Sequence, residues 1–514
     1  MNKHRRGSFR VAWSAWISIL LAVCCSASVA APELELEADL GRVQREVSDR
    51  SLFNPATCAG YLSRNTRFLL ERGAETYMPR DNAGLQRLRE QAPELLERMF
   101  RLRLSLAERL RTFHDAGTVP PECVDAIRRA LRYSRFVEEL LAELLVKAKE
   151  QALPTVALQG GVPSLLVNPA FAPLELRSGD LLLVRGSSFF SAAIARIGDE
   201  DGQFSHLAMT YTADDGGRYV MEAMFDSGVV IVPLDEWLSH GPARLLVFRQ
   251  QDARLAEQAA RDIHDWIAAA RESGRTIPYD YRMNTQDRSE FFCAELVGFA
   301  YERASAGQLR LPAYPTSLQA LRGHPFLENM GIRDRTTFAP GDVELDPRLQ
   351  LVAEWRNLRH SAETRIKDAI LTSLLDWMAT HGYQLTYRGL LQGGVEIYWA
   401  LLRPFGVLEE RLPANMEKSF LKSMLGLHSA AGLVYERIAP PLLEAGEDNP
   451  LALDYKAILT VTEEYRRRDC RRLRAHRRWQ RDNPVHMDGE DEPPRAELHY
   501  LIEVPGGDGC PLGN

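Results

Sequence analysis

The spacing of apolar residues changes twice along this chain, and this change limits the folds that the chain can adopt. Up to about residue 155, apolar residues recur at helical spacing, as at Leu102, Leu106 and Leu110. After Pro163 short β-type runs take over, and beyond residue 345 helical spacing returns. We therefore expect an α+β protein in which a small antiparallel sheet lies between N- and C-terminal helical regions.

A chain of 514 residues exceeds what one hydrophobic core usually serves, so several domains are expected. The pattern predicts a signal peptide at 1–30, a helical region at 31–155, an α+β domain at 170–330, a second helical region at 345–480 and a polar tail at 481–514. Pro120-Pro121 and Pro440-Pro441 are expected to break helices. The net charge of -7 argues against nucleic acid as the main partner, because phosphate binding requires a basic surface.

The first thirty residues have the pattern of a targeting segment. Basic residues between Lys3 and Arg10 precede an apolar run at 11–23, and small residues at 28–30 stand before a cleavage point ahead of Ala31. This pattern predicts a periplasmic or otherwise exported protein. The alternative is a lipoprotein anchored through Cys24, although Val23 is bulkier than such cleavage normally tolerates.

Removal of that segment would leave five of the seven cysteines in an oxidising compartment, so at least one thiol would stay free. Pairing of near neighbours would join Cys58 to Cys123 and Cys470 to Cys510, which leaves Cys293 unpaired. The alternative is a set of several buried free thiols.

Strands are expected where short β-type runs lie between turn residues. These runs are 181–184, 205–212, 218–225, 229–232 and 245–248. Helices are expected at 187–197 and 253–271, and a further helix contains Cys293. Ser289 is expected to cap that helix, so that Cys293 falls in its first turn, where unpaired backbone N–H groups stabilise a thiolate. Cys293 is thus a candidate nucleophile.

The hairpin formed by strands 205–212 and 218–225 defines the surroundings of His206. If its loop has an odd number of residues, with Gly216 in the left-handed conformation, Glu222 lies opposite Ala208 and within reach of His206. Glu222 would then orient the imidazole. With an even loop, no residue on the face of His206 could do so, and Asp214 at the turn tip is a further alternative.

Cys293, His206 and Glu222 together have the composition of a nucleophilic triad. His206 would accept the thiol proton, Glu222 would fix the imidazole ring, and the thiolate would attack an acyl carbon. The backbone N–H of Cys293 is the expected oxyanion donor, and Tyr281 or Gln286 is the expected second donor.

Six segments of the middle domain resemble a known family. They are Gly179-Asp180, Phe204 to Met209, Val220 to Ala223, Val229 to Pro233, Pro278 to Tyr281 and Phe292 to Val297. They resemble the permuted papain-like amidases of the YaeF/YiiX type, within the NlpC/P60 superfamily, over about residues 175–305. In papain-like enzymes the cysteine precedes the histidine, and here the order is reversed, as circular permutation would produce. The resemblance implies Cys293 as nucleophile, His206 as base and Glu222 as third member; Ala294 stands where a common family version has serine.

Other segments offer less chemistry. The glycines around Ser429 are spaced differently from those of a serine hydrolase elbow, and their context is helical. The remaining histidines show no metal-ligand spacing, so no metal or cofactor is expected. The arginine-rich run 466–481 is interpreted as a solvated helix face paired with the acidic residues 488–492, and the alternative is a patch for membrane lipid or cell-wall polymer.

These residues and the resemblance together predict an exported cysteine hydrolase that cleaves an amide bond through a thioester acyl-enzyme. The expected substrate is a peptide, an acyl-amide or a cell-wall peptide. One alternative is lipid acyl transfer or ester cleavage with the same Cys–His pair, as in the related lecithin:retinol acyltransferase group. Another is a non-catalytic envelope scaffold or binding protein.

Overall fold

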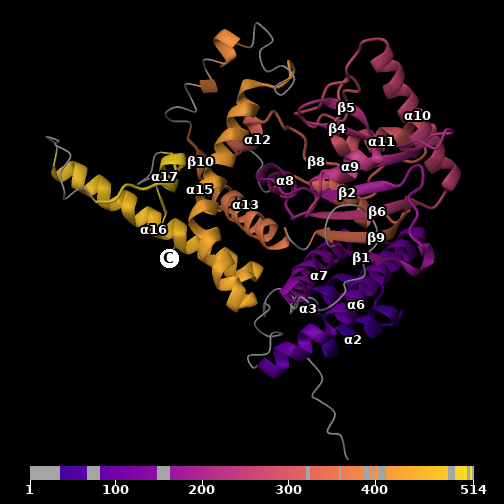
Figure 1. The fold of residues 1–514 in the computed structure, drawn as a ribbon, viewed down its shortest axis with the longest axis horizontal. Coiled ribbons are helices and arrows are strands. Elements are labelled where there is room, and N and C mark those ends of the chain that lie inside the picture. Colours follow the sequence, from indigo (N-terminus) through magenta and orange to yellow (C-terminus); the bar gives the residue numbers. More distant parts are fainter. Residues whose placement is uncertain are drawn as a thin grey trace, which may run out of the picture.

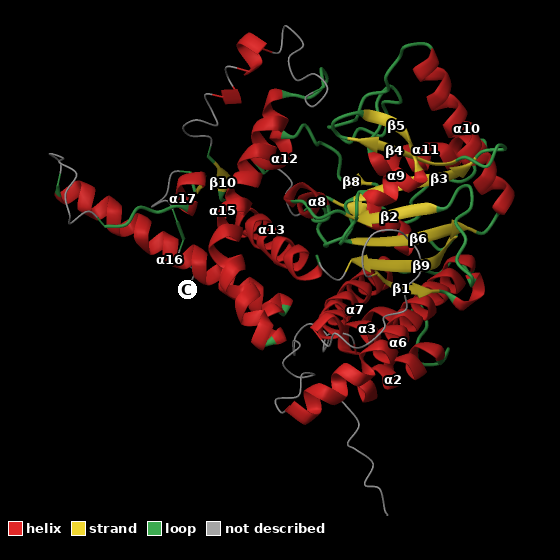
Figure 2. Ribbon diagram, viewed as in Figure 1, coloured by secondary structure: helices red, strands yellow, loops and turns green. Residues whose placement is uncertain are grey.

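The structure is a computed structural model that describes residues 35–65, 82–147, 163–319, 324–357, 360–386, 394–395, 398–402, 413–483, 493–505 and 510–511. The predicted signal peptide lies outside the described residues. The described residues form an antiparallel sheet of seven strands, with helical regions on two sides of it (Figures 1 and 2). This arrangement confirms the predicted α+β fold class.

The described part of the N-terminal region is helical. It contains α2 (Glu35–Ser48), α3 (Cys58–Asn65), α6 (Asn82–Asp115) and α7 (Pro121–Lys147). The predicted break at Pro120-Pro121 is confirmed, because Pro121 opens α7, where the first turn does not require its missing N–H. A disulfide between Cys58 and Cys123 ties α3 to α7, a second joins Cys470 to Cys510, and Cys293 is free, as predicted.

The main sheet contains seven strands, and its order is β1-β9-β6-β2-β3-β4-β5. Its strands are β1 (Pro163–Val167), β2 (Leu181–Arg185), β3 (His206–Thr212), β4 (Arg218–Met224), β5 (Gly228–Pro233), β6 (Arg244–Gln250) and β9 (Leu349–Asn357). The predicted return to helix at residue 345 is wrong, because β9 follows and extends the α+β unit beyond residue 330. Almost every residue of β9 is buried, so this strand lacks the alternation that marks a half-exposed strand.

Short helices and bridges complete the α+β unit. They are η1 (Pro169–Phe171), α8 (Phe189–Ile194), α9 (Leu234–Ser239), α10 (Ala253–Glu272), α11 (Cys293–Ala304), β7 (Thr316–Ser317), α12 (Pro325–Asn329), β8 (Thr336–Thr337) and η2 (Pro340–Leu345). Apolar residues of α10 and α11 share a core with one face of the sheet, and those of α9 share a core with the other. The helix at 189–194 is shorter than the predicted 187–197.

The β3–β4 hairpin has the predicted register. Met209 pairs with Met221, Thr210 pairs with Val220, and the turn between Ala213 and Gly217 has three residues. Gly216 has a φ of +87°, which is a conformation that glycine adopts without steric cost. Continuing this register places Glu222 opposite Ala208 and on the same face of the sheet as His206.

The C-terminal region is again mostly helical in its described part. It contains α13 (Ser361–His381), β10 (Gln384–Leu385), η3 (Tyr398–Leu402), α15 (Lys418–Asp448), η5 (Pro450–Leu453), α16 (Tyr455–Asp482), α17 (Leu498–Leu501) and β11 (Ile502–Glu503). The predicted break at Pro440-Pro441 is wrong, because α15 continues through both prolines. Ile438, Ala439 and Leu442 are buried at this point, and their packing compensates for the lost helical hydrogen bonds.

The arginine-rich run of α16 is only partly the solvated face that the sequence predicts. Arg467, Arg468 and Arg471 are exposed, whereas Arg466 is fully buried and donates to the Tyr383 hydroxyl and the Pro511 carbonyl. The acidic partner predicted at 488–492 lies outside the described residues.

A buried cluster of ion pairs joins the N-terminal helices to the sheet. Its members are Arg103, Arg135, Arg244, Arg356, Arg365, Glu138, Glu139, Glu143, Glu344 and Glu354. Glu354 of β9 forms an ion pair with Arg103 of α6 and a second one, of 2.7 Å, with Arg356. Because α6 and α7 supply part of this cluster, the N-terminal helices and the sheet share one buried interface.

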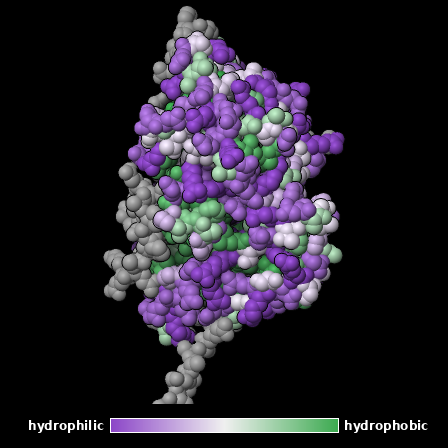
Figure 3. All heavy atoms as spheres, turned by 90° about the vertical axis from the view of Figure 1, so that its right-hand side faces the viewer, coloured by the Kyte–Doolittle hydropathy of each residue, from purple (hydrophilic) through white to green (hydrophobic). Residues whose placement is uncertain are grey.

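Figure 3 shows the right-hand side of the view in Figure 1. This face is mostly hydrophilic, and its hydrophobic residues gather in a hollow across the middle. Among the described helices, none combines the length and the apolar character that crossing a bilayer requires.

Candidate active site

Cys293 is the first residue of α11, and it is 4% exposed. The predicted cap at Ser289 is wrong: Phe292 is the N-cap, and the Ser289 hydroxyl donates to Asp287 at 2.6 Å. The helix starts late because the preceding chain is paired, with the Phe291 N–H donating to the Pro278 carbonyl at 3.1 Å. This pairing places the thiol at the first helical position, where backbone N–H groups lack intrahelical partners.

His206 opens β3, and its ring lies against Glu222 of β4. The distance between Nε2 of His206 and Oε2 of Glu222 is 2.6 Å. The same carboxylate oxygen accepts a hydrogen bond from Nε1 of Trp237 in α9, at 2.8 Å. Asp214, the alternative orienter, is 85% exposed and pairs with Arg261, so the structure brings Glu222 and not Asp214 to the imidazole.

The imidazole of His206 also hydrogen-bonds to Cys293. Burial by itself favours the neutral ring, but the hydrogen bonds to Cys293 and Glu222 outweigh it and raise the pKa of His206 to about 10. Burial likewise opposes ionisation of Glu222, but the hydrogen bonds from His206 and Trp237 lower the pKa of its carboxyl. The ring of His206 is therefore charged at neutral pH and pairs with the Glu222 carboxylate.

The three side chains open into a cavity of about 430 Å³. Its walls are largely apolar and include Val184, Phe190, Ile194, Met224, Phe225, Trp237 and Pro242. His240 also lines the cavity and is exposed. Ser187, Ser188, Ser191 and Ser205 line it as well. A cavity of this size, with mainly apolar walls and some polar side chains, is typical of a site for a small molecule or an acyl group.

The structure does not bring either predicted second oxyanion donor to the thiol. The hydroxyl of Tyr281 donates to the Phe225 carbonyl, and Gln286 lines a separate cavity beside Arg288. Tyr279, which the sequence did not single out, lines the cavity of Cys293 instead. Burial, followed by the charge of the nearby sulfur, raises the pKa of Tyr279, so its hydroxyl keeps a proton to donate. The motif Tyr279-Asp280-Tyr281 indicates that a tyrosine hydroxyl is the second oxyanion donor, but it does not indicate which of the two tyrosines supplies it.

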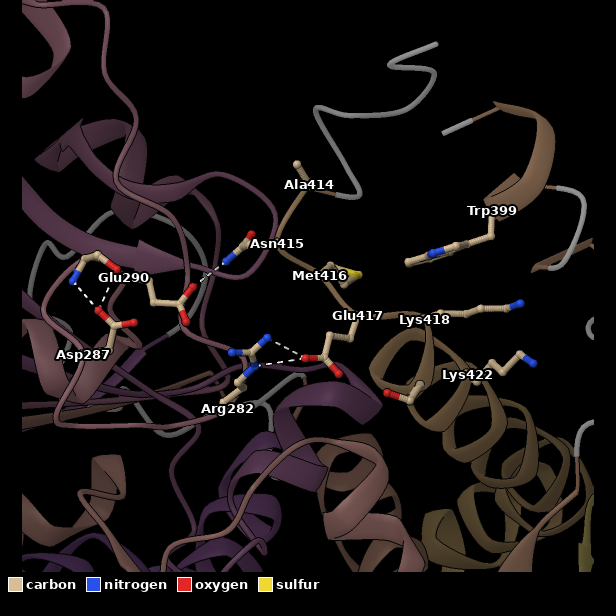
Figure 4. A pocket seen from close by; sticks show the side chains of 12 residues that line it. Arg282, Asp287, Glu290, Trp399, Ala414, Asn415, Met416, Glu417, Lys418 and Lys422 are labelled. Carbon is tan, nitrogen blue, oxygen red and sulfur yellow. Dashed lines mark hydrogen bonds and ion pairs between the residues drawn. The ribbon is translucent and has the colours of Figure 1, made fainter. Parts of the chain in front are cut away.

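The C-terminal region contacts the segment that positions Cys293. A second groove, separate from the cavity of Cys293, lies between the loop that contains Arg282 and Glu290 and the start of α15 (Figure 4). Its volume is about 870 Å³. The Asn415 amide donates to a Glu290 oxygen at 2.9 Å and to the Tyr279 carbonyl at 2.7 Å. Arg282 donates to Glu417 at 2.7 Å. Asn415, which precedes α15, thus contacts both the segment around Tyr279 and the segment around Glu290. These two segments pair with each other just before α11.

Two other candidate sites, the group around His499 and the residue Ser429, have a structural explanation. Cys470, Cys510 and His499 have ligand atoms within 4.8 Å of one another, but the two sulfurs form a disulfide. The His499 ring is bonded to Asp469 at 2.8 Å and to the Tyr383 hydroxyl at 3.0 Å. Ser429 lies within α15 and donates to the Leu425 carbonyl at 2.8 Å, as expected for a packing residue.

An α+β domain in which a buried free thiol meets an imidazole and a carboxylate has the composition of a papain-like cysteine hydrolase. Residues 175–353 match the model of a family described as permuted papain-like amidase enzyme, YaeF/YiiX, C92 family. The match covers about a third of the chain and identifies residues 175–353, and not the whole chain, as a papain-like cysteine amidase domain. The match extends past residue 305, the limit of the sequence resemblance, into β9. Comparisons with curated proteins and with solved structures gave no match.

Proposed function

We propose that this protein hydrolyses an amide with a large apolar acyl group, with Cys293 as nucleophile, His206 as acid and base, and Glu222 as the orienting carboxylate. The observation that carries the proposal is the chain of hydrogen bonds from the Cys293 thiol through His206 to Glu222, at the wall of an apolar cavity. The raised pKa of His206 and the lowered pKa of Glu222 match the acid role of the ring and the orienting role of the carboxylate.

The reaction has two steps. The Cys293 thiolate attacks the amide carbonyl carbon, the backbone N–H of Cys293 and the Tyr279 hydroxyl donate to the oxyanion, and the amine leaves with the proton from His206. A thioester acyl-enzyme results. Water then attacks the thioester carbon and gives a proton to His206, and the carboxylic acid is released with the thiol. If another acceptor replaces water, the same groups perform acyl transfer.

The composition of the cavity supports one of the substrate classes that the sequence left open. The walls formed by Phe190, Ile194 and Phe225 match an apolar acyl group better than a charged cell-wall peptide, because a charged group in an apolar pocket loses hydration. Lipid ester cleavage and acyl transfer use the same cavity and the same Cys–His pair, so they are the second candidate. Cell-wall peptides are the third.

We also propose that the protein acts outside the cytoplasm. The basic and apolar pattern of residues 1–30 supports this location, and so do two disulfides, which persist in oxidising compartments. A lipoprotein anchor at Cys24 is the alternative. Peripheral contact with membrane or cell wall through the exposed arginines of α16 is a further proposal, supported by Arg467, Arg468 and Arg471.

A substrate screen tests the proposed function. The protein without residues 1–30 is incubated with N-acyl amino acids of increasing acyl length, with acyl esters and with peptidoglycan fragments, and Cys293→Ala serves as the control. We expect release of amine from the long-chain amides only with intact Cys293. Cleavage of peptidoglycan fragments alone would overturn the apolar-acyl assignment. Equal, background rates for both proteins on every substrate would favour the scaffold.

Glu222→Gln should move the alkaline limit of amide hydrolysis to lower pH. The protonated His206 ring, which must protonate the leaving amine, is present below its pKa of about 10 and is lost above it. Removal of the Glu222 charge removes part of what raises that pKa. The profile of kcat/KM against pH should therefore fall at lower pH in the variant. Trp237→Phe keeps the carboxylate and should shift the alkaline limit less. If the pH profiles of Glu222→Gln and wild type coincided, the orienting role of Glu222 would be contradicted.

A further inference from the structure

One segment between β2 and β3 supplies much of the wall of the active-site cavity. Seven of the residues that line the cavity belong to it: Ser205 and, at 186–194, Gly186, Ser187, Ser188, Phe190, Ser191 and Ile194. The segment includes α8 and runs to the start of β3, whose first residue is His206. Its position therefore determines the shape of the cavity in front of the thiol.

A single carboxylate of α13 holds this segment on both sides of α8. Oδ1 of Asp368 accepts hydrogen bonds from Nε of Arg185 at 3.2 Å and from Nη1 of Arg196 at 2.8 Å. Both guanidinium groups are buried, and Asp368 is 14% exposed. Arg196 also donates to the Thr372 hydroxyl, one turn further along α13, at 2.8 Å. Burial opposes the charge of Asp368, but the two arginines outweigh it and lower the pKa of the carboxyl, so the pairs are charged.

The middle of the segment is held by Lys367, which precedes Asp368 in α13, and by α15. The Lys367 ammonium donates to the Ser187 carbonyl at 3.0 Å and lies over the rings of Phe189 and Tyr435, at 5.7 and 5.5 Å from their centroids. Phe189 packs edge-on against Tyr435, whereas the neighbouring Phe190 contacts Phe225 in the cavity. The C-terminal helices thus hold the outer side of α8, and its inner side faces the substrate.

We propose that Asp368 is a positioning residue that fixes the cavity wall at 186–194, so that helices outside the family-matched residues 175–353 set the acyl specificity of the amidase domain. The proposal rests on the proposed function for its kinetic consequence. Its structural half, that α13 holds the wall, stands on the contacts of Arg185, Arg196 and Ser187 and can be tested without a substrate.

Hydrogen exchange tests the structural half in the full chain. Asp368→Asn should speed exchange of the backbone amides at 187–197 by about tenfold or more, because loss of the charge weakens the contacts of Arg185 and Arg196 at the same time, although Arg196 keeps its ion pair with Asp201 at 3.0 Å. Asp376→Asn is the matched control, since Asp376 is exposed on the same helix, and it should leave that exchange unchanged. Unchanged exchange at 187–197 in the folded Asp368→Asn protein would overturn the proposal, even if no substrate is found.

Kinetics with the amide series test the specificity half. Asp368→Asn should raise KM for long-chain amides by about tenfold, with kcat and the rate of Cys293 alkylation within about threefold of wild type. Short-chain amides, which do not reach the wall, should show little change. Equal losses for all chain lengths, or a loss in kcat alone, would overturn the specificity role.

A milder variant covers the case in which Asp368→Asn fails to fold. Lys367→Met keeps the aliphatic stem but removes the donor to the Ser187 carbonyl, and the affected side chain lies at the surface. It should raise KM for long-chain amides in the same direction, by about threefold, with normal thermal unfolding. A KM equal to that of wild type across the series would overturn the proposal. If wild type cleaves none of the amides, the proposed function fails while the exchange experiment still decides the structural half.

Discussion

Replacement of His206 by alanine should slow alkylation of Cys293 by iodoacetamide at pH 7 by about 30-fold, because a thiol of ordinary pKa, about 8.5, is only about 3% ionised at that pH. In the wild-type protein the buried thiol hydrogen-bonds to an imidazole whose pKa is raised to about 10, so the ring keeps its proton at pH 7 and its charge would stabilise an adjacent thiolate. Amide hydrolysis should fall by about a thousandfold or more, because the proposed mechanism uses His206 as both base and acid.

The pH dependence and a second histidine provide the controls. Alkylation of the His206→Ala protein should rise steeply between pH 7 and 9, whereas the wild-type rate should change little over that range. His240→Ala removes a histidine from the same cavity that has no hydrogen bond to the thiol among the described contacts, and it should alter the rate by less than about threefold. Equal and slow alkylation of wild type and His206→Ala would favour the scaffold function.

Glu354→Gln should lower the free energy of unfolding by about 3–5 kcal/mol, because it leaves buried guanidinium groups without their counter-charge. Glu354 of β9 is 1% exposed and pairs with Arg103 and Arg356, and Arg244 lies 3.9 Å away. The cluster has equal numbers of arginines and glutamates, so removing one carboxylate leaves an excess positive charge in the interior. Urea denaturation followed by tryptophan fluorescence measures the loss.

Glu257→Gln is the matched control for this change. Glu257 is 59% exposed, and its ion pair with Arg261, at 3.2 Å, lies on the surface of α10. Surface pairs of this kind stabilise by at most about 1 kcal/mol, so the variant should unfold close to wild type. If Glu354→Gln were as stable as Glu257→Gln, the cluster would not hold the N-terminal helices to the sheet as its contacts indicate.

Local features of the active site followed from the sequence. The register that places Glu222 beside His206 depends on the three-residue turn and on Gly216, both of which are properties of one hairpin. The free state of Cys293 followed from pairing neighbouring cysteines. The helix that carries Cys293 was recognisable from its apolar pattern, but its starting residue was not, because the pairing of Phe291 with Pro278 delays it.

Features that join distant segments did not follow from the sequence. Trp237 reaches Glu222 from α9, a separate helix that packs on the same face of the sheet, and Tyr279 rather than Tyr281 lines the cavity, although both belong to the same short motif. The strand β9 was taken for helix because it is buried on both sides. In each case the deciding contact is made only after folding has brought separate elements together.

The sequence by itself determined which chemical groups this protein can use and the face of the hairpin on which His206 and Glu222 lie, because alternation along a strand is a local rule. Only the tertiary structure decided what surrounds those groups. Arg185 and Asp368 are 183 residues apart in the chain, and no local pattern specifies that they meet. The chemistry of the site therefore follows from local sequence, whereas the shape of its cavity follows from long-range packing.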